Sequence, residues 1–140
     1  MSPAAVLAPV FAQLALTFGL LLWMGTLRVR ALQRHDLHIR DIALGEPNWP
    51  VRIKQVENAF RNQLELPVLF YLLVVLALFT GWATAGFVVA SWVFVASRFV
   101  HAAIHTTSNN VPRRFWVYTA GLFLLMGMWL WFAAAVAFGG

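Results

Sequence analysis

The sequence predicts an all-α integral membrane protein: a single domain over residues 1–140 whose four transmembrane helices form an up-down bundle. The first observation behind this prediction is the composition, since 61% of the residues are hydrophobic and only 11% are charged. Soluble domains have about 25% charged residues, so an ordinary soluble domain is excluded. The second is the distribution of charge, because residues 1–27, 66–97 and 115–140 contain no charged side chain. A bilayer-spanning helix needs about 20 apolar residues, and these stretches with their flanks supply four.

The first span is predicted over residues 5–27, where an apolar run ends at Arg28 and Arg30. These basic residues follow the apolar run instead of preceding it, which is unlike a cleaved signal peptide. A polar cytoplasmic loop is expected next, over residues 28–56. Residues 46–50 within it contain two prolines, which exclude regular helix there.

The second span is predicted over residues 57–79 and the third over residues 85–106, joined by a short uncharged turn. Residues 107–112 end in a proline and break the helix, and the fourth span is predicted over residues 113–138. Residues 70–78 form a continuous apolar run, which excludes the alternating pattern of a membrane β-barrel strand.

Basic residues are concentrated in the loops that join span one to span two and span three to span four, while the termini and the middle turn have none. Because short basic loops face the cytoplasm, both basic loops are predicted inside and both termini outside. The net charge of +5 reflects this bias, and no nucleic-acid partner is expected. The chain has no cysteine, which excludes disulfides, thiolate metal sites and a cysteine nucleophile.

Polar residues inside the spans are the candidates for a site. On the second span they recur at helical spacing i, i+3, i+4 and i+7, as Asn58, Arg61, Asn62 and Glu65. On the third span, Arg98, His101 and His105 likewise share one face. An ionisable group at the bilayer centre costs about 2.5–3.5 kcal/mol, so these faces must meet a partner, a water-filled cavity or a ligand.

Two interpretations of these residues stay open. Glu65 can pair with Arg61 or Arg98 as purely structural contacts between and within helices. Alternatively, the polar residues converge with Arg28, Arg113 and Arg114 on one pocket at the cytoplasmic side. Arginine forks bind carboxylates, and a glutamate accepts from an amine, so such a pocket favours an anionic, peptide-like ligand beside a hydrophobic second substrate.

A metal site and a transporter are both disfavoured. His101 and His105 are four residues apart, but Glu65 is the only further ligand nearby and the neighbouring arginines repel a cation, so no metal is predicted. Transporters often have interrupted spans in corresponding positions of two halves. Pro67 is the only proline well inside a predicted span, and no other span matches it.

The second-span run Arg61-Asn62-Gln63-Leu64-Glu65, followed by Pro67 and Phe70, resembles the signature of the MAPEG family, the membrane-associated proteins in eicosanoid and glutathione metabolism. The third-span run Arg98-Phe99-Val100-His101, with His105 and then Arg114, is similar to that of the microsomal prostaglandin E synthases and glutathione transferases in this family. Arg28-Val29-Arg30 at the end of the first span fits the same pattern. The resemblance covers nearly the whole chain and points to a bacterial branch.

The resemblance implies a homotrimer in the bacterial inner membrane that takes glutathione as co-substrate and binds it between neighbouring subunits. It implies that Arg114 lies near the thiol as the catalytic residue, with Arg113 as the competing candidate. The glutathione-binding set is predicted to be Arg28, Asn58, Arg61, Asn62, Glu65, Arg98, His101, His105 and Arg113. The expected function is a transferase or peroxidase acting on lipophilic electrophiles or lipid hydroperoxides. The alternative is a non-catalytic lipid-binding or scaffold protein of the same fold.

Overall fold

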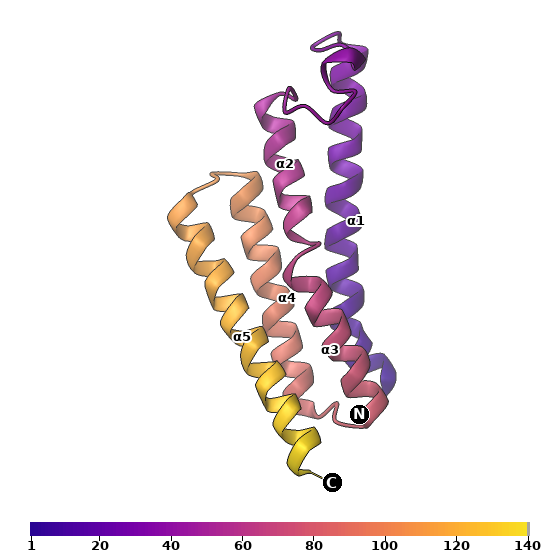
Figure 1. The fold of residues 1–140 in the computed structure, drawn as a ribbon, viewed down its shortest axis with the longest axis vertical. Helices are drawn as coiled ribbons and strands as arrows, with labels where there is room; N and C mark the ends of the chain where they lie inside the picture. The colour runs from indigo at the N-terminus through magenta and orange to yellow at the C-terminus, as the bar shows by residue number, and fades with distance from the viewer. Residues whose placement is uncertain (140) are drawn as a thin grey trace.

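The computed structural model describes residues 1–139, and every regular element in this range is helical. The elements are α1 (Pro3–Gln33), the short 3-10 helix η1 (Ile39–Asp41), α2 (Val51–Asn62), α3 (Leu66–Thr80), α4 (Ala85–Thr106) and α5 (Val111–Phe138). Figure 1 shows the long helices running up and down in turn, with both termini at one end of the bundle and the loops over residues 34–50 and 107–110 at the other. The predicted all-α membrane fold is confirmed.

Four segments are long and apolar enough to cross a membrane: α1, α2 together with α3, α4, and α5. The third span has the predicted bounds, whereas α1 continues beyond residue 27 to Gln33. Arg28 and Arg30 are therefore helical, because arginine is a good helix former and its long side chain reaches water from a helix end. The loop between the first two spans is correspondingly shorter than predicted and covers residues 34–50.

The second span is not one continuous helix. It breaks between Asn62 and Leu66, and Pro67 lies in the first turn of α3. Proline has no N–H and its ring clashes with the preceding turn, so it starts a helix better than it continues one. Glu65 therefore stands at the N-terminus of α3 instead of on the same helix as Asn58 and Asn62.

A buried pair of glutamines stabilises this break. The side-chain amide of Gln63 donates to the carbonyl oxygen of Ala59 (3.0 Å) and accepts from the amide nitrogen of Gln13 on α1 (2.9 Å). Both glutamine side chains are buried. The turn between α2 and α3 is therefore tied to α1 by hydrogen bonds, which satisfy polar groups that apolar surroundings would leave unpaired.

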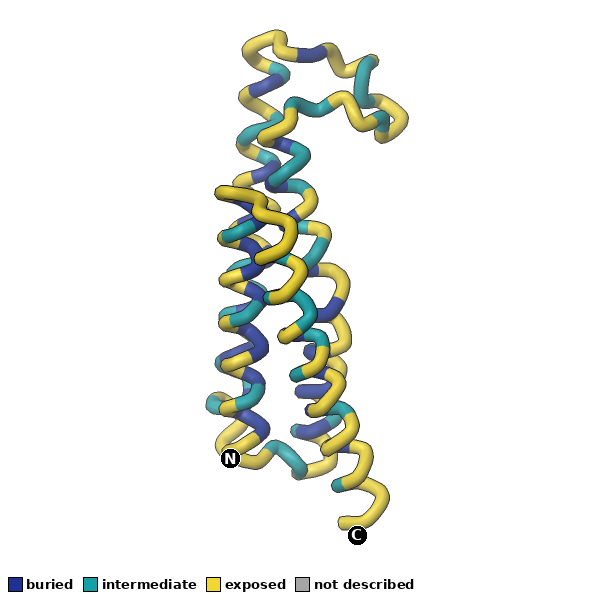
Figure 2. The backbone as a smooth tube through the Cα atoms, turned by 90° about the vertical axis from the view of Figure 1, so that its left-hand side faces the viewer, coloured by how far each residue is buried: buried dark blue, intermediate teal, exposed yellow. Residues whose placement is uncertain are grey.

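The largest apolar cluster fills the half of the bundle nearer the termini, and smaller clusters around Ala59 and Ile53 lie further toward the loops. Phe70 of α3 and Phe94 of α4 are fully buried with ring centroids 4.9 Å apart, and Leu125 of α5 packs in the same cluster. Figure 2 shows that much of α5 is exposed, and its exposed residues include Phe123 and Leu130. An apolar outer surface is suited to contact with lipid. The polar residues that line the candidate site lie in the other half of the bundle.

Helix α2 also holds the C-terminal end of α4. The amide of Gln55 donates to the carbonyl oxygens of His105 (2.7 Å) and Thr107 (3.1 Å), and the guanidinium of Arg52 donates to that of Thr106. The last carbonyls of a helix have no partner within the helix, so these side chains serve as its cap. The cap fixes the end of α4 from which His105 projects.

Candidate functional site

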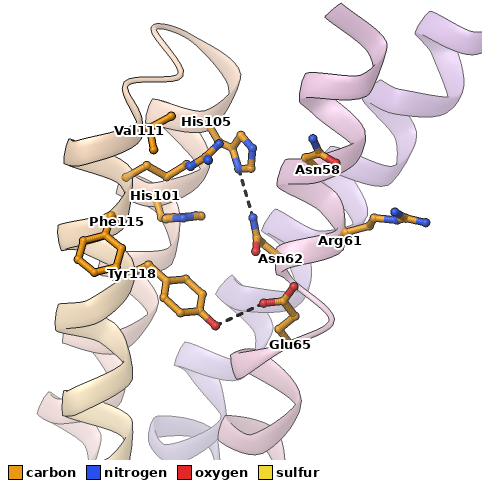
Figure 3. Close-up of a pocket in the computed structure, with 10 residues that line it drawn as sticks. Asn58, Arg61, Asn62, Glu65, His101, His105, Val111, Phe115 and Tyr118 are labelled. Carbon is orange, nitrogen blue, oxygen red and sulfur yellow. Dashed lines mark hydrogen bonds between the residues drawn. The ribbon is translucent and has the colours of Figure 1, made fainter. Parts of the chain in front are cut away.

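A cavity of about 500 Å³ lies between α2–α3 on one side and α4–α5 on the other, toward the loop end of the bundle (Figure 3). It is lined by polar residues from all four helices and by two apolar residues of α5. The lining residues are Asn58, Arg61, Asn62, Glu65, His101, His105, Val111, Arg114, Phe115 and Tyr118. Seven of the ten sequence-predicted site residues are among them; Arg28, Arg98 and Arg113 are not.

The α2–α3 wall carries the two asparagines, Arg61 and Glu65. The pairing of Arg61 with Glu65 that the sequence allows does not form in the described chain; instead Nε of Arg61 lies 3.7 Å from Oε1 of Glu57. The Arg61 side chain extends away from α4 and α5 in Figure 3. Glu65 is exposed and makes no salt bridge in the described chain, so its carboxylate is available to a ligand.

Two hydrogen bonds connect the walls across the cavity. The amide nitrogen of Asn62 lies 3.2 Å from Nδ1 of His105, and the hydroxyl of Tyr118 donates to Oε2 of Glu65 (3.3 Å). Both contacts are drawn in Figure 3. The ring centroid of His101 lies 5.6 Å from that of His105 and 5.7 Å from that of Tyr118, so the three rings form one cluster on the α4–α5 wall.

Tyr118 is a site residue that the sequence patterns did not single out. It follows Arg114 by four residues, so both side chains lie on the same face of α5. That spacing was the available signal, since a tyrosine carries a polar hydroxyl into an otherwise apolar span.

Arg114 reaches the cavity, and its Nη1 donates to the side-chain oxygen of Asn109 in the preceding loop (2.6 Å). Arg113 is exposed and does not line the cavity. The difference follows from where α5 begins: Asn110 caps the helix by accepting from the backbone N–H of Arg113 (3.1 Å). Successive helical residues point about 100° apart, so Arg114 faces the cavity while Arg113 faces outward.

Arg98 lies behind the cavity instead of in it. Its side chain is completely buried, its Nη2 is 3.2 Å from Nδ1 of His101, and its guanidinium carbon is 5.2 Å from the ring centroid of Tyr118. The pairing of Arg98 with Glu65 that the sequence allows does not form in the described chain. Arg98 therefore contacts the site through the aromatic residues that line it.

Arg28 borders a second cavity of about 520 Å³ beneath the loop over residues 34–50. Its Nη2 lies 3.1 Å from Oε2 of Glu57, and its guanidinium carbon is 4.8 Å from the ring centroid of Trp49. Asn58 and Arg61 line both cavities. Glu57 forms salt bridges with Arg28 and with Arg61. The predicted binding set is thus divided between two adjacent cavities that share a wall.

The first cavity offers donors on the α4–α5 side and a carboxylate opposite them. Such an arrangement suits a ligand that carries both an anionic group and an amine. Val111 and Phe115 are exposed apolar residues on the rim, which would admit a lipophilic molecule. Residues 1–139 contain no cluster of three or more His, Asp or Glu side chains that could hold a metal ion.

Comparison with known proteins gives one match. The sequence model of the MAPEG family matches residues 6–134, which is nearly the whole chain. No curated protein and no solved structure matches the chain significantly.

Proposed function

The chain belongs to the MAPEG family, whose members include glutathione transferases, glutathione peroxidases and non-catalytic proteins, and from this premise we propose that it is a membrane-bound glutathione-dependent transferase or peroxidase. Its substrates are lipophilic electrophiles or lipid hydroperoxides. The observation that carries the proposal is the meeting of Arg114 with Asn62, Glu65, His101 and His105 around one cavity. A purely structural set of polar residues has no need of such a shared opening.

Arg114 supplies the catalytic charge in this proposal. A thiol is nucleophilic as its thiolate, and a guanidinium beside it favours the anion while remaining protonated itself. In a transferase reaction the thiolate sulfur attacks the electrophilic carbon, forms a carbon–sulfur bond, and the displaced electron pair takes a proton or leaves with its group. In a peroxidase reaction the sulfur attacks the terminal oxygen of the hydroperoxide, the O–O bond breaks, and that oxygen stays on sulfur as a sulfenic acid. The remaining alkoxide takes a proton from water and leaves as an alcohol, and a second glutathione thiol converts the sulfenic acid to the disulfide with release of water.

The polar ends of glutathione are assigned by charge. Glu65 accepts from the ammonium group, while Arg61 and, through the adjacent cavity, Arg28 hold carboxylates. Asn58, Asn62 and the two histidines bind the peptide groups. Asn58, Arg61 and Glu65 are all exposed in the single chain, which supports a homotrimer in which a neighbouring subunit covers this wall of the cavity.

The test is a titration of the detergent-solubilised protein with glutathione, followed by the ultraviolet absorbance of the thiolate. We expect a saturable signal for the wild type and for Arg113→Ala, and none for Arg114→Ala. Loss of one preorganised charge contact lowers turnover by about 10²–10³-fold, so conjugation or peroxidase activity should fall in parallel. An unchanged thiolate signal in Arg114→Ala would overturn the assigned role.

A second candidate function, a non-catalytic lipid-binding or scaffold protein, is favoured by a different observation. An apolar cavity of about 430 Å³ opens between α4 and α5 nearer the termini, lined by Phe87, Phe123, Met128 and Trp131 among others. Absence of glutathione binding, together with co-purified lipid, would favour this function over the enzyme.

A further inference from the structure

Arg98 is a buried cation without an anionic partner. None of its surface is exposed, no carboxylate within the described chain forms a salt bridge with it, and its Nε and Nη1 atoms have no hydrogen-bond partner. Burying an unpaired charge is costly, and in a membrane-spanning helix such a residue usually serves a function. The one side-chain hydrogen bond that Arg98 makes in the described chain therefore indicates its role.

That contact is with one nitrogen of His101. Nη2 of Arg98 lies 3.2 Å from Nδ1 of the histidine, and both side chains are buried. A guanidinium carries only donors, so Nδ1 must act as the acceptor. A neutral imidazole has one donor nitrogen and one acceptor nitrogen, so the proton is then on Nε2.

We propose that Arg98 is a positioning residue that fixes His101 as its Nε2–H tautomer. His101 lines the cavity, and with Nδ1 engaged, Nε2 is the only ring nitrogen left for a ligand. The histidine then offers a hydrogen-bond donor and binds an acceptor oxygen, such as a carboxylate or a peptide carbonyl. This inference rests on the proposed function, because the bound peptide thiol supplies that oxygen.

The guanidinium is held in this orientation by α5. Its central carbon lies 5.2 Å from the ring centroid of Tyr118, whose hydroxyl is in turn bonded to Glu65. Gly121, one turn further along α5, lies beside it: a Cβ there would be 3.8 Å from Nη1 of Arg98, an ordinary van der Waals contact, and 2.8 Å from Oγ of Ser97. The histidine tautomer is thus coupled to the α4–α5 packing and to the carboxylate on the far wall.

His105 provides an internal control. Its Nδ1 lies 3.2 Å from the amide nitrogen of Asn62, and no hydrogen bond joins it to Arg98. A change at Arg98 should therefore alter the proton position on His101 and leave that on His105 unchanged.

The experiment is ¹⁵N NMR of histidine-labelled protein, with His101→Gln and His105→Gln used to assign the signals. For the wild type without glutathione we expect His101 to show a protonated Nε2 and an unprotonated Nδ1. Arg98→Met should give a mixture of tautomers at His101 alone, and Arg98→Lys, which keeps a charged donor, should restore much of the wild-type pattern.

Glutathione binding gives a second readout. We expect Arg98→Met to raise the dissociation constant about five- to tenfold, the size of one misdirected hydrogen bond, and Arg98→Lys to raise it less. A wild-type His101 protonated on Nδ1, or an unchanged tautomer in Arg98→Met, would overturn the proposal. Where Arg98→Met does not fold, a wild-type His101 protonated on Nδ1 still overturns the proposal, and Arg98→Lys supplies the comparison spectrum. If the tautomers behave as expected while no variant binds glutathione, the positioning role stands and the proposed function fails.

Discussion

The hydrogen bond between Gln13 and Gln63 joins α1 to the break in the second span, and both side chains are buried in apolar surroundings. The oxygen of the Gln13 amide has no partner, so the bond to Gln63 is the one that its side chain makes in the described chain. Sequence patterns gave no signal for Gln13, because a single polar residue in a span has no periodicity. Its partner can only be found once the helices are packed.

We expect Gln63→Leu to destabilise the protein by about 1–2 kcal/mol, because it leaves the amide of Gln13 buried without a partner. The measurement is the unfolding free energy in mixed micelles. The controls are Gln13→Leu and the Gln13→Leu/Gln63→Leu double variant. Because the double variant leaves neither amide without its partner, its loss of unfolding free energy should be smaller than the sum of the two single losses. Additive losses would show that the two amides are not coupled.

At the scale of helices, the break in the second span decides how the site is assembled. The i, i+3, i+4, i+7 spacing predicts one continuous face from Asn58 to Glu65, and the structure brings the same residues to one cavity by a different route. Pro67 ends the helical continuity, and the turn then places Glu65 opposite Tyr118. The pattern alone predicts which residues meet, but not that they come from two helices.

The third span shows that residues on one helical face need not all line the same cavity. Arg98, His101 and His105 lie on one face as predicted, yet only the two histidines line the cavity. Arg98 is one turn deeper and is covered by α5, so its distance along the helix, not its face, removes it from the cavity. Similarly, the choice between Arg113 and Arg114 depends on the helix start at Asn110, which composition and spacing leave open.

The packing of α4 against α5 makes a sharp prediction for Gly121. A methyl group there would lie 2.8 Å from Oγ of Ser97, so Gly121→Ala must turn this hydroxyl away from the carbonyl oxygen of Phe94, to which it donates (2.6 Å), or push the helices apart. We expect a loss of about 1–3 kcal/mol in unfolding free energy, the usual cost of overpacking, and weaker glutathione binding because the cavity spans these two helices. Gly127→Ala on the same helix is the matched control, since a Cβ there meets no atom within 4 Å. Equal effects of the two substitutions would contradict the steric explanation.

At the scale of the whole molecule, the charge-free stretches predicted the fold because a bilayer accepts few structures other than helices whose backbone groups are internally satisfied. The distribution of charge could not place the end of α1 or the start of α2, because both helices extend into residues 28–56, the region predicted as loop. An apolar run in the sequence marks only the part of a helix that spans the bilayer, whereas the backbone hydrogen bonds of the helix continue beyond it.

The predicted topology can be measured directly, because the chain has no cysteine of its own. Single cysteines at Ser2, beside the N-terminus, and at Ser108, in the loop before α5, should react differently with a membrane-impermeant maleimide applied to spheroplasts. We expect Ser2→Cys to be labelled and Ser108→Cys to be labelled only after lysis, as the positive-inside rule requires. The reverse labelling pattern would overturn the predicted orientation.

The polar cavity lies toward the end of the bundle that carries the basic loops, while Val111 and Phe115 form an exposed apolar rim. Under the proposed function, the two reactants therefore reach the protein from two different phases. One is supplied at its concentration in water and the other at its mole fraction in the bilayer. The apparent affinity for the lipophilic reactant is then a property of the membrane as much as of the protein: added lipid dilutes it, and the rate falls although no contact in the site has changed.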